Sequence, residues 1–492
     1  MDQTKSRRVI IIGAGLSGKI IASEILTKGT FGDVVAFLDD DAEKVGGEID
    51  GVPILGPIGE VKNHLQSIPA DEAIIAIPNA AQNDIERIYS DLKSAGIATI
   101  RILPRLSQII DSPPHFIQTR EINTQDFLRR EPAVISLKKS LTYLRGQRVL
   151  ITGAGGSIGS ELSRQLLYGG AQRLYLFDHA ENNLYEVEKE LKLLQNAGIG
   201  EAATIVPVVG DLKDRTYMDF IIKRLKADVI FHCAAYKHVP MMEANPIEAV
   251  KNNVFGTKNL VDAALKYSVS RFVLVSTDKA ADPICVYGAS KMLAEEIVLH
   301  ASTESTHFMV VRFGNVLDSR GSIVPLFRDQ ILSGGPVTVT DPEASRFFMT
   351  LPESASLVLK AGGVGEAGQL YILDMGEQIM IRDLAEQMIR FHGFTPGKDI
   401  QIEYIGLRPG DILNESLFSA DETLEETPYP RINRLIRKPR FDGELDSILR
   451  LLEPICDFDS SRPEEYRNRK LLRNTLHHYL PSVRTPENEP EY

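Results

Sequence analysis

Two stretches of the chain repeat one pattern of apolar and polar positions. Each begins with a run of β-branched residues, which is typical of a strand buried on both faces, and continues with a glycine-rich turn and an amphipathic stretch. Each then reaches a second apolar run that ends in an acidic residue. The first stretch runs from Arg8 to Asp39 and the second from Arg148 to Asp178. This pattern predicts an α/β protein with two tandem Rossmann-like domains, each a doubly wound parallel sheet.

Further apolar runs extend both domains. They predict strands at 72–77, 98–103, 204–208, 228–232, 271–276 and 308–312, and helices at 247–267 and 287–300. From residue 315 the alternation weakens and Gly/Pro pairs appear, which indicates a small substrate-binding lobe. We therefore expect an N-terminal nucleotide-binding or regulatory domain at 1–118, a connector at 119–143, a catalytic domain at 144–314, a C-terminal lobe at 315–480 and a disordered tail at 481–492.

Composition places the chain among soluble globular proteins. The hydrophobic fraction is 43%, and the net charge of -12 gives no electrostatic footprint for nucleic acid or an anionic membrane. No apolar run reaches the roughly 18 residues that span a bilayer, and the polar N-terminus has no signal-peptide pattern. The three cysteines, Cys233, Cys285 and Cys456, lack metal-ligand spacing. We expect a cytoplasmic protein without a metal site, and a homo-oligomer by default.

The second glycine-rich turn has the spacing of a dinucleotide fingerprint. Gly153 permits a sharp turn, Gly156 a close approach to pyrophosphate, and Gly159 close packing of helix and strand. Ser157 and Ile158 would open a helix whose N-terminus attracts phosphate. The sequence therefore predicts NAD or NADP at this turn.

Two acidic positions would contact the adenosine half of that cofactor. Asp178, about 20 residues after the turn, should bind the ribose, and a carboxylate there ordinarily favours NAD, although NADP stays open. Asp211 and Leu212, at the end of the third strand, are placed to contact the adenine. In the first domain, Gly13, Gly15, Gly18 and Asp39 form a second fingerprint, which marks either a bound nucleotide or a Rossmann-shaped structural or regulatory domain.

Acid/base residues follow the strand predicted at 271–276. Thr277, Asp278 and Lys279 stand at its carboxyl end, where ligands of open α/β sheets bind. Tyr287 and Lys291 have the i, i+4 spacing that places them on one helix face. A nearby ammonium lowers a tyrosine pKa from its usual value near 10, so this pair could remove a proton from a sugar hydroxyl. Asp278 and Lys279 form either a second acid/base pair or a surface ion pair.

From about residue 148 to 418 the chain resembles the polysaccharide-biosynthesis nucleotide-sugar 4,6-dehydratases of the extended short-chain dehydrogenase superfamily. The matching segments are 152–159, 234–240, 251–257, 276–280, 311–316, 335–340, 346–350 and 407–411. The first domain, with segments 37–41 and 51–56, resembles the additional N-terminal domain of the long members. The resemblance implies a UDP-N-acetylglucosamine 4,6-dehydratase that forms a UDP-4-keto-6-deoxy-hexosamine for surface polysaccharide or glycan biosynthesis.

The resemblance also implies roles for single residues. Tyr287 with Lys291 would deprotonate the C4 hydroxyl, Lys279 would take the C5 proton, Asp278 would protonate the departing C6 hydroxyl, and Thr277 would bind the 4-oxyanion. A neutral Lys279 requires a lowered pKa. Cofactor contacts are expected from Ala234, Lys237 and Ser276, and substrate contacts from Lys237, Asn315, Arg346 and Arg408. Members of this family mostly use NADP.

The chain departs from the long members in several ways. They usually carry membrane helices ahead of the first domain, and many have Met where this chain has Tyr287. Asp318 and Asp341 stand where Gly and His are expected, which leaves the substrate open. The alternatives are a nucleotide-sugar 4-epimerase, the same chemistry on a GDP-linked sugar, and a non-catalytic NAD(P) sensor, against which the intact pairs Tyr287/Lys291 and Asp278/Lys279 argue.

Overall fold

The computed structural model describes residues 7–28, 32–77, 80, 82–102, 120–121, 141–200, 202–303, 306–441, 443–486 and 489. The chain forms two compact units. The first comprises Met1–Val134, Ile323–Val339 and Arg382–Glu403, and the second comprises Ile135–Ser322, Thr340–Ile381 and Tyr404–Tyr492. Most of the connector expected at 119–143 lies outside the described residues.

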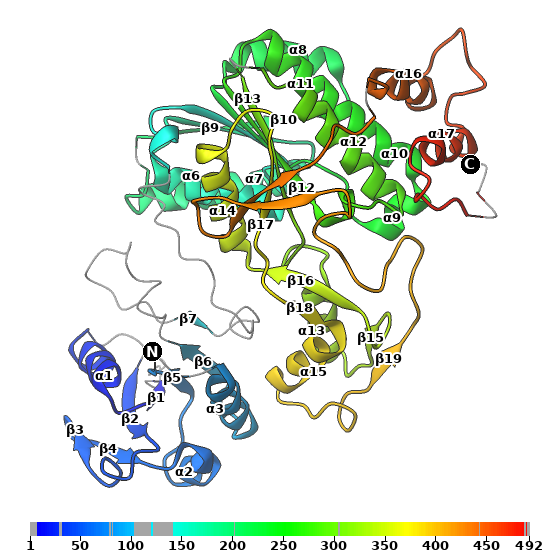
Figure 1. The fold of residues 1–492 in the computed structure, drawn as a ribbon. Helices are drawn as coiled ribbons and strands as arrows, with labels where there is room; N and C mark the ends of the chain where they lie inside the picture. The colour runs from blue at the N-terminus through cyan, green and yellow to red at the C-terminus, as the bar shows by residue number, and fades with distance from the viewer. Residues whose placement is uncertain are drawn as a thin grey trace. The chain divides into compact units, whose positions relative to one another are not determined.

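The first unit contains a mostly parallel sheet in the order β3-β4-β2-β1-β5-β6-β7 (Figure 1). Its parallel strands are β1 (Arg8–Ile12), β2 (Asp33–Leu38), β4 (Val52–Leu55), β5 (Glu72–Ile75) and β6 (Thr99–Ile102). The short strands β3 (Glu48–Ile49) and β7 (Arg120–Glu121) pair antiparallel at its edges. The strands expected at 72–77 and 98–103 are thus confirmed, with shorter bounds.

Alternation along β1 places helices on both faces of this sheet. Val9 and Ile11 pack in one core with Ile21 of α1 (Leu16–Lys28). Ile10 and Ile12 pack in another core with residues of α2 (Val61–Ser67) and α3 (Gln82–Ser94). A strand buried on both sides therefore needs the continuous apolar run that the sequence contains.

The second unit contains the larger sheet, in the order β10-β9-β8-β11-β12-β13-β17-β21-β20. The parallel strands are β8 (Arg148–Thr152), β9 (Arg173–Asp178), β10 (Thr204–Val209), β11 (Val229–His232), β12 (Arg271–Thr277), β13 (His307–Phe313) and β17 (Leu370–Leu373). An antiparallel edge is added by β21 (Ile432–Ile436) and β20 (Thr423–Glu426). The reversal of strand order beside β8 creates the crevice in which ligands of such sheets bind.

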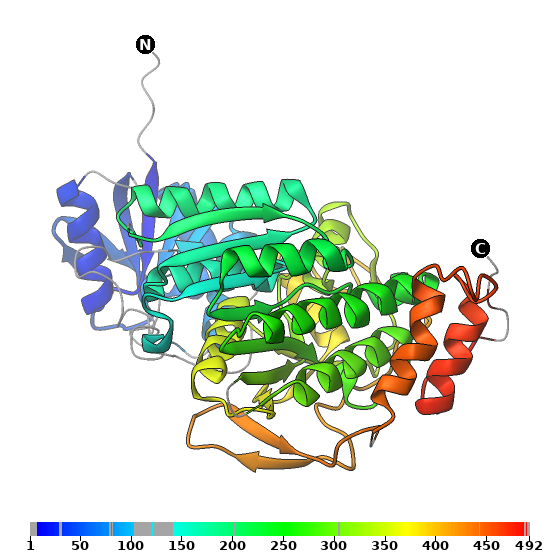
Figure 2. The ribbon, with the colours of Figure 1, turned by 90° about the horizontal axis from the view of Figure 1, so that it is seen from above.

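Helices cover both faces of this sheet, as expected for a doubly wound fold (Figure 2). One face carries α6 (Ser157–Gly169), α7 (Glu181–Asn196) and α14 (Leu351–Val364), and the other carries α8 (Arg215–Leu225), α11 (Thr257–Lys266) and α12 (Val286–His300). The C-terminal helices α16 (Leu445–Cys456) and α17 (Arg469–Tyr479) pack against each other and against α10 (Pro246–Val250) and α12. Their apolar residues join the main core of the unit.

The helix expected at 247–267 is interrupted by a π-helical segment. α10 ends at Val250, residues Lys251–Gly256 form the π segment, and α11 begins at Thr257. Asn253, in the wide turn, accepts a hydrogen bond from the Tyr236 backbone N–H and donates to Ser290 Oγ of α12. The wide turn thus directs an amide side chain toward the loop after β11, and such turns are frequent at functional sites.

Segments after residue 315 are divided between the two units. β14 (Asn315–Val316), β16 (Ser345–Met349) and β18 (Gln378–Met380) form a small sheet of the second unit. In contrast, α13 (Ile323–Leu332), β15 (Val337–Val339) and α15 (Ile381–Phe391) lie largely in segments that group with the first unit. In that unit the Tyr89 and Phe391 rings stack at 4.4 Å. The expected boundaries 144–314 and 315–480 therefore stay predictions.

Described residues near the end of the chain contact α17, and the disordered tail expected at 481–492 stays a prediction. Val483 is buried, and its carbonyl oxygen lies 2.9 Å from His477 Nδ1. Glu489 forms ion pairs with Arg469 and Arg473 of α17. In the ranges that the structure describes, every helix is too short or too polar to traverse a lipid bilayer.

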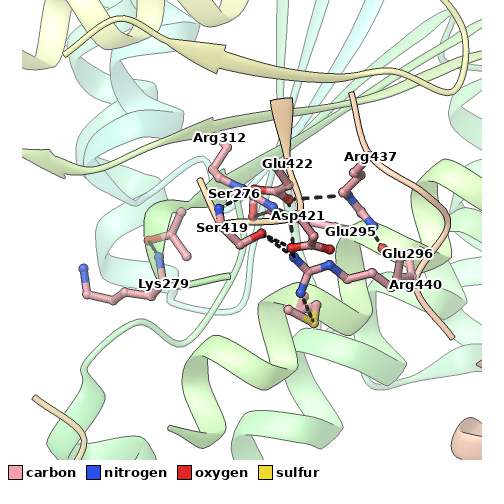
Figure 3. Close-up of polar contacts among 12 residues, drawn as sticks. Ser276, Lys279, Glu295, Glu296, Arg312, Ser419, Asp421, Glu422, Arg437 and Arg440 are labelled. Carbon is pink, nitrogen blue, oxygen red and sulfur yellow. Dashed lines mark hydrogen bonds and ion pairs between the residues drawn. The ribbon is translucent and has the colours of Figure 1, made fainter. Parts of the chain in front are cut away.

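A buried network of charges ties α12 to β13 and to the segment around β20 and β21 (Figure 3). Arg312 of β13 donates to Glu295 of α12 at 2.7 Å and to Glu422 at 2.8 Å. Arg437 extends the network by pairing with Glu296 and Glu422, and Arg440 also pairs with Glu422. All of these carboxylates are almost fully buried, so each must be compensated by a cation.

Arg312→Leu should destabilise the second unit strongly. The change leaves Glu295 and Glu422 buried without their shared cation, and breaking such a pair costs about 3–5 kcal/mol. Urea unfolding followed by circular dichroism should show the loss. The control Arg382→Leu removes a half-exposed ion pair with Asp383 and should change the midpoint little. Equal midpoints for the two variants would contradict the structural role of Arg312.

Candidate functional site

The turn between β8 and α6 has the geometry that its glycines require. Gly153 has a φ of +68°, which is favourable only for glycine, and a side chain there would lie 2.7 Å from the Ala234 backbone nitrogen. A Cβ at Gly159 would lie 2.2 Å from the Gly153 carbonyl oxygen. Ser157 and Ile158 form the first turn of α6, so its free N–H groups face the turn.

A pocket lies beside this turn at the carboxyl ends of β8 to β11. It is lined by Gly153, Gly156, Phe177, Asp178, Asp211, Leu212, Ala234 and Tyr236, among others. The sequence-predicted adenosine contacts Asp178, Asp211 and Leu212 therefore share one cavity with the glycine turn. Asp178 Oδ2 accepts a hydrogen bond from Gly155 N at 2.9 Å, and Oδ1 accepts one from Ala180 N. These residues fit a dinucleotide, because backbone, carboxylate and apolar surfaces converge where its pyrophosphate, ribose and base would lie.

Arg320 reaches the same turn and was not anticipated from the sequence. Its Nη1 donates to the Gly155 carbonyl oxygen at 3.0 Å, and its backbone N–H donates to Ser157 Oγ at 3.0 Å. An arginine beside a phosphate-binding turn adds a positive charge where a pyrophosphate would be held. Arg320 follows the family-like segment 311–316 but is not part of it. The sequence pattern therefore does not predict that the Arg320 side chain reaches the glycine turn.

Thr277, Asp278 and Lys279 stand together at the carboxyl end of β12, as the sequence predicts. Thr277 is the last residue of the strand, and Asp278–Ala280 form a single 3₁₀ turn. The Thr277 hydroxyl donates to Asp278 Oδ1 at 2.9 Å, and Lys279 Nζ donates to the same oxygen at 3.2 Å. Asp278 and Lys279 therefore form a partly buried pair rather than a surface ion pair.

Tyr287 and Lys291 lie in the first half of α12, one turn apart and buried. Lys291 Nζ donates to the Val275 carbonyl oxygen of β12 at 2.9 Å, which ties the helix to the strand. Ser276, one residue on, donates to Glu295 of the same helix. α12 is thereby held against the end of β12 at two points, which positions Tyr287 beside Thr277.

The pKa values of this pair differ from the sequence expectation. Burial raises the pKa of Tyr287 to about 12, although the Lys279 charge and a hydrogen bond with Thr277 oppose the rise. Burial lowers the pKa of Lys291 to about 8, against the opposing effect of Glu295. The cation that favours a Tyr287 phenolate is therefore Lys279, while Lys291 is engaged with Val275.

Glu415 completes the acid/base cluster and was not identified from the sequence. Its Oε1 lies 2.7 Å from Lys279 Nζ and 3.0 Å from Arg346 Nε, and its Oε2 accepts a hydrogen bond from Asn315 at 2.7 Å. Its contact with Lys279 joins positions 136 residues apart, and the resemblance motif at 407–411 ends before it. No local spacing could have revealed this contact.

The carboxylates control the protonation of Lys279. Burial alone would lower the pKa of Lys279, but the charges of Asp278 and Glu415 outweigh it and raise that pKa. Burial and the neighbouring Glu415 raise the pKa of Asp278. For Glu415, Lys279 and Arg346 outweigh burial and lower the pKa. A neutral Lys279 would require a lowered pKa, whereas the charges of Asp278 and Glu415 raise it.

The predicted substrate contacts divide between the cluster and the surface. Asn315 and Arg346 both bind Glu415, and Arg346 also donates to the carbonyl oxygens of Ser345, Ile412 and Leu413. Arg408 is half-exposed and paired with Asp411. Desolvation and the charge of Lys279 lower the pKa of Lys237, which indicates that these two amines are neighbours. Diphosphate binding by Arg346 and Arg408 stays a prediction.

The loop between Lys279 and Tyr287 is anchored by the end of the chain. Ser482 Oγ donates to the Pro283 carbonyl oxygen at 2.8 Å, and the Arg484 backbone N–H donates to that of Ile284 at 3.0 Å. Glu243 accepts a hydrogen bond from Val286 N at 2.7 Å and is held by Arg473 of α17 at 3.0 Å. Residues near 480 thus fix the loop that joins the two halves of the acid/base set.

The first unit repeats one feature of the cofactor turn. Ala14 N donates to Asp39 Oδ2 at 2.7 Å, as Gly155 N does to Asp178. A Cβ at Gly18 would lie 2.0 Å from the Gly13 carbonyl oxygen, so this glycine is required for packing. Gly15 has open space around it. A nucleotide at this turn stays a prediction, because the packing requirement holds with or without a ligand.

The fold and the turn together define the chain as a Rossmann-fold α/β protein of the extended short-chain dehydrogenase class. The family model described as "Polysaccharide biosynthesis protein" matches residues 149–437, and the "PglD N-terminal domain" model matches residues 8–83. The chain belongs to the polysaccharide biosynthesis protein family. Within the described residues, no group of His, Cys, Asp and Glu side chains is arranged to hold a metal ion.

Relatives cover most of the chain. It is 38% identical to the probable polysaccharide biosynthesis protein EpsC of Bacillus subtilis, over 91% of this chain and 74% of that protein. It is 31% identical to a UDP-N-acetylglucosamine 4,6-dehydratase (inverting) of Campylobacter jejuni, over 56% of this chain and 79% of that protein. It is also 31% identical to a UDP-glucose 4-epimerase of Rickettsia bellii, over 66% of this chain and 95% of that protein. The X-ray structure of Pen from Bacillus thuringiensis matches 61% of this chain and 90% of its own, with 33% identity and a TM-score of 0.55.

Gly159→Ala should weaken dinucleotide binding at least about tenfold, because its Cβ would push against the Gly153 carbonyl oxygen. Fluorescence titration with NADPH and NADH measures the change. Gly59→Ala is the matched control, since that glycine has open space around it. Undiminished affinity in a folded Gly159 variant would remove the turn from the binding site.

Proposed function

We propose that the chain is a nucleotide-sugar 4,6-dehydratase that converts UDP-N-acetylglucosamine to a UDP-4-keto-6-deoxy-hexosamine. The observation that carries the proposal is the pair Asp278 and Lys279, 3.2 Å apart at the end of β12 and beside Tyr287. Oxidation at C4 needs one proton acceptor. Loss of water across C5 and C6 needs a further acid and a further base. The site provides groups for all three tasks.

NADP or NAD would be held by the turn at Gly153–Gly159, with Asp178, Asp211 and Leu212 around the adenosine and Arg320 beside the pyrophosphate. When bound, the dinucleotide supplies a hydride acceptor at C4 and returns the hydride at C6. Ala234, Lys237 and Ser276 are the further cofactor contacts proposed. Tyr287 and Lys291 are proposed to contact both nicotinamide and sugar.

The side chains divide the proton transfers among them. Tyr287 takes the C4 hydroxyl proton, and Thr277 donates a hydrogen bond to the resulting oxygen. Lys279 takes the C5 proton that the 4-keto group acidifies, while Asp278 gives a proton to the C6 oxygen so that it leaves as water. Lys279 then returns its proton to C5. Because the pKa of Lys279 is raised, its amine must first pass a proton to Asp278, whose Oδ1 lies 3.2 Å away; Asp278 then carries the proton that the C6 oxygen takes.

A 4-epimerase is the second candidate, supported by the similarity to the UDP-glucose 4-epimerase of Rickettsia bellii. An epimerase would use Tyr287 and Lys291 in the same way. It would not require an acid and a base at Asp278 and Lys279, because no water is lost. The dehydratase could also act on a GDP-linked sugar. Among the described residues, none is proposed to contact the nucleobase of the sugar nucleotide, so the choice between UDP and GDP stays open.

Incubation of the full chain with UDP-N-acetylglucosamine and catalytic NADP should give a product lighter by one water. Mass spectrometry detects the loss, and a reaction in deuterated water should add deuterium at C5. GDP-mannose in a parallel reaction tests the nucleotide. A product of unchanged mass and altered configuration at C4 would establish the epimerase instead.

Lys279→Ala and Asp278→Asn should each reduce dehydration at least about a hundredfold while dinucleotide binding stays intact. Each variant lacks one partner of the elimination but keeps the cofactor turn. Rapid-quench product analysis measures the rate of dehydration, and titration with NADPH measures dinucleotide binding. Full turnover by the Lys279 variant would remove this residue as the base.

A further inference from the structure

The carboxylate of Glu415 lies at the centre of the charged cluster. It contacts Lys279 at 2.7 Å and Arg346 at 3.0 Å, and it accepts a hydrogen bond from Asn315 at 2.7 Å. The backbone carbonyl oxygen of Glu415 accepts a further hydrogen bond from Gln378 of β18. Glu415 is therefore fixed by strands β14, β16 and β18 while its side chain holds Lys279.

Asp278 shows why a second carboxylate matters here. Its side chain is 0% exposed, whereas that of Lys279 is 22% exposed. Among the described residues, no N–H or O–H group donates to the buried Asp278 Oδ2, and the Glu415 carboxyl group is its neighbour. A buried carboxylate oxygen without a donor is unfavourable when charged. The cluster therefore favours a proton on Asp278 and a negative charge on Glu415, which has two cations against it.

We propose that Glu415 is a positioning residue for the dehydration step, which fixes the Lys279 amine and sets the pH range in which the Asp278–Lys279 pair exchanges protons with substrate. This inference rests on the proposed dehydratase function. Glu415 acts through Lys279 and Asp278. The acid/base unit of this site is then a triad of two carboxyl groups and one amine.

Groups from several elements face this triad. Tyr287 of α12 and Lys237 of the loop after β11 interact electrostatically with Lys279. Arg346 of β16 contacts Glu415 Oε1, the oxygen that also contacts Lys279, and Asn315 donates from its uncharged amide to Oε2. The charge of Glu415 thus offsets two or more cations, and its removal leaves an excess of positive charge around Lys279.

The sign of the resulting change follows from these charges. Glu415 raises the pKa of Lys279 by stabilising its ammonium form. It also raises the pKa of Asp278 by opposing a second negative charge. Without the Glu415 charge both pKa values fall. The Lys279 amine then becomes neutral at lower pH, and the Asp278 carboxyl group also loses its proton at lower pH.

Glu415→Gln should therefore displace both limbs of the pH profile of kcat/KM toward acid, by about 1–3 pH units. Glu415→Asp, which keeps the charge, should lower the rate but leave the profile near its wild-type position. Glu422→Gln is the matched control: it also removes a buried glutamate with arginine partners, and Lys279 points away from that network in Figure 3. It should leave the position of the profile unchanged. A Glu415→Gln profile that loses height without displacement would reduce Glu415 to a structural residue and overturn the inference.

A measurement without turnover separates this inference from the proposed function. Trace acetylation with acetic anhydride across pH, followed by peptide mass spectrometry, reports the pKa of Lys279 in the full chain. In the wild-type protein Lys279 should react only at higher pH than exposed lysines such as Lys189, and in Glu415→Gln at lower pH than in the wild type. If the protein shows these shifts in Lys279 reactivity but does not dehydrate UDP-N-acetylglucosamine, the proposed dehydratase function is rejected. The role of Glu415 in holding Lys279 is then retained. A wild-type Lys279 that titrates at or below an ordinary lysine would overturn the inference even if Glu415→Gln does not fold.

Discussion

The attachment of α12 to the end of β12 is the constraint on which the site depends. Lys291 donates to the Val275 carbonyl oxygen, and Ser276 donates to Glu295, so helix and strand are joined by contacts from consecutive strand residues. Glu295 is itself held by Arg312 of the neighbouring strand. Because all of these groups are buried, the helix has little freedom to rotate, and Tyr287 is fixed beside Thr277.

The same burial makes the charges of the site sensitive to one another. In a region of low dielectric constant, each carboxylate or amine is stable only through its partners. The charges of Asp278 and Glu415 therefore raise the pKa of Lys279. Lys291 lacks such a pair of carboxylates, and burial lowers its pKa. Two lysines twelve residues apart thus have opposite shifts. Their different surroundings are consistent with different proposed tasks in one reaction.

The end of the chain belongs to the same arrangement. Ser482 and Arg484 bind the loop that connects Lys279 to Tyr287, and Arg473 holds Glu243 against the first turn of α12. The C-terminal helices bury their apolar residues in the core of the second unit, so they provide a rigid support for this loop. The chain therefore uses a segment from beyond the common sheet to fix the geometry at its carboxyl edge.

The sequence by itself determined the two Rossmann-like sheets, the glycine turn and the placement of Thr277, Asp278, Lys279, Tyr287 and Lys291, because each depends on local spacing or on a strand period. It could not predict Glu415, Arg320 or the support from Arg473, since these contacts join segments more than 100 residues apart. It also could not show that the charges of two carboxylates would raise the pKa of Lys279. A protonation equilibrium depends on which charges are nearest in space and how deeply they are buried. Only the tertiary structure decides that.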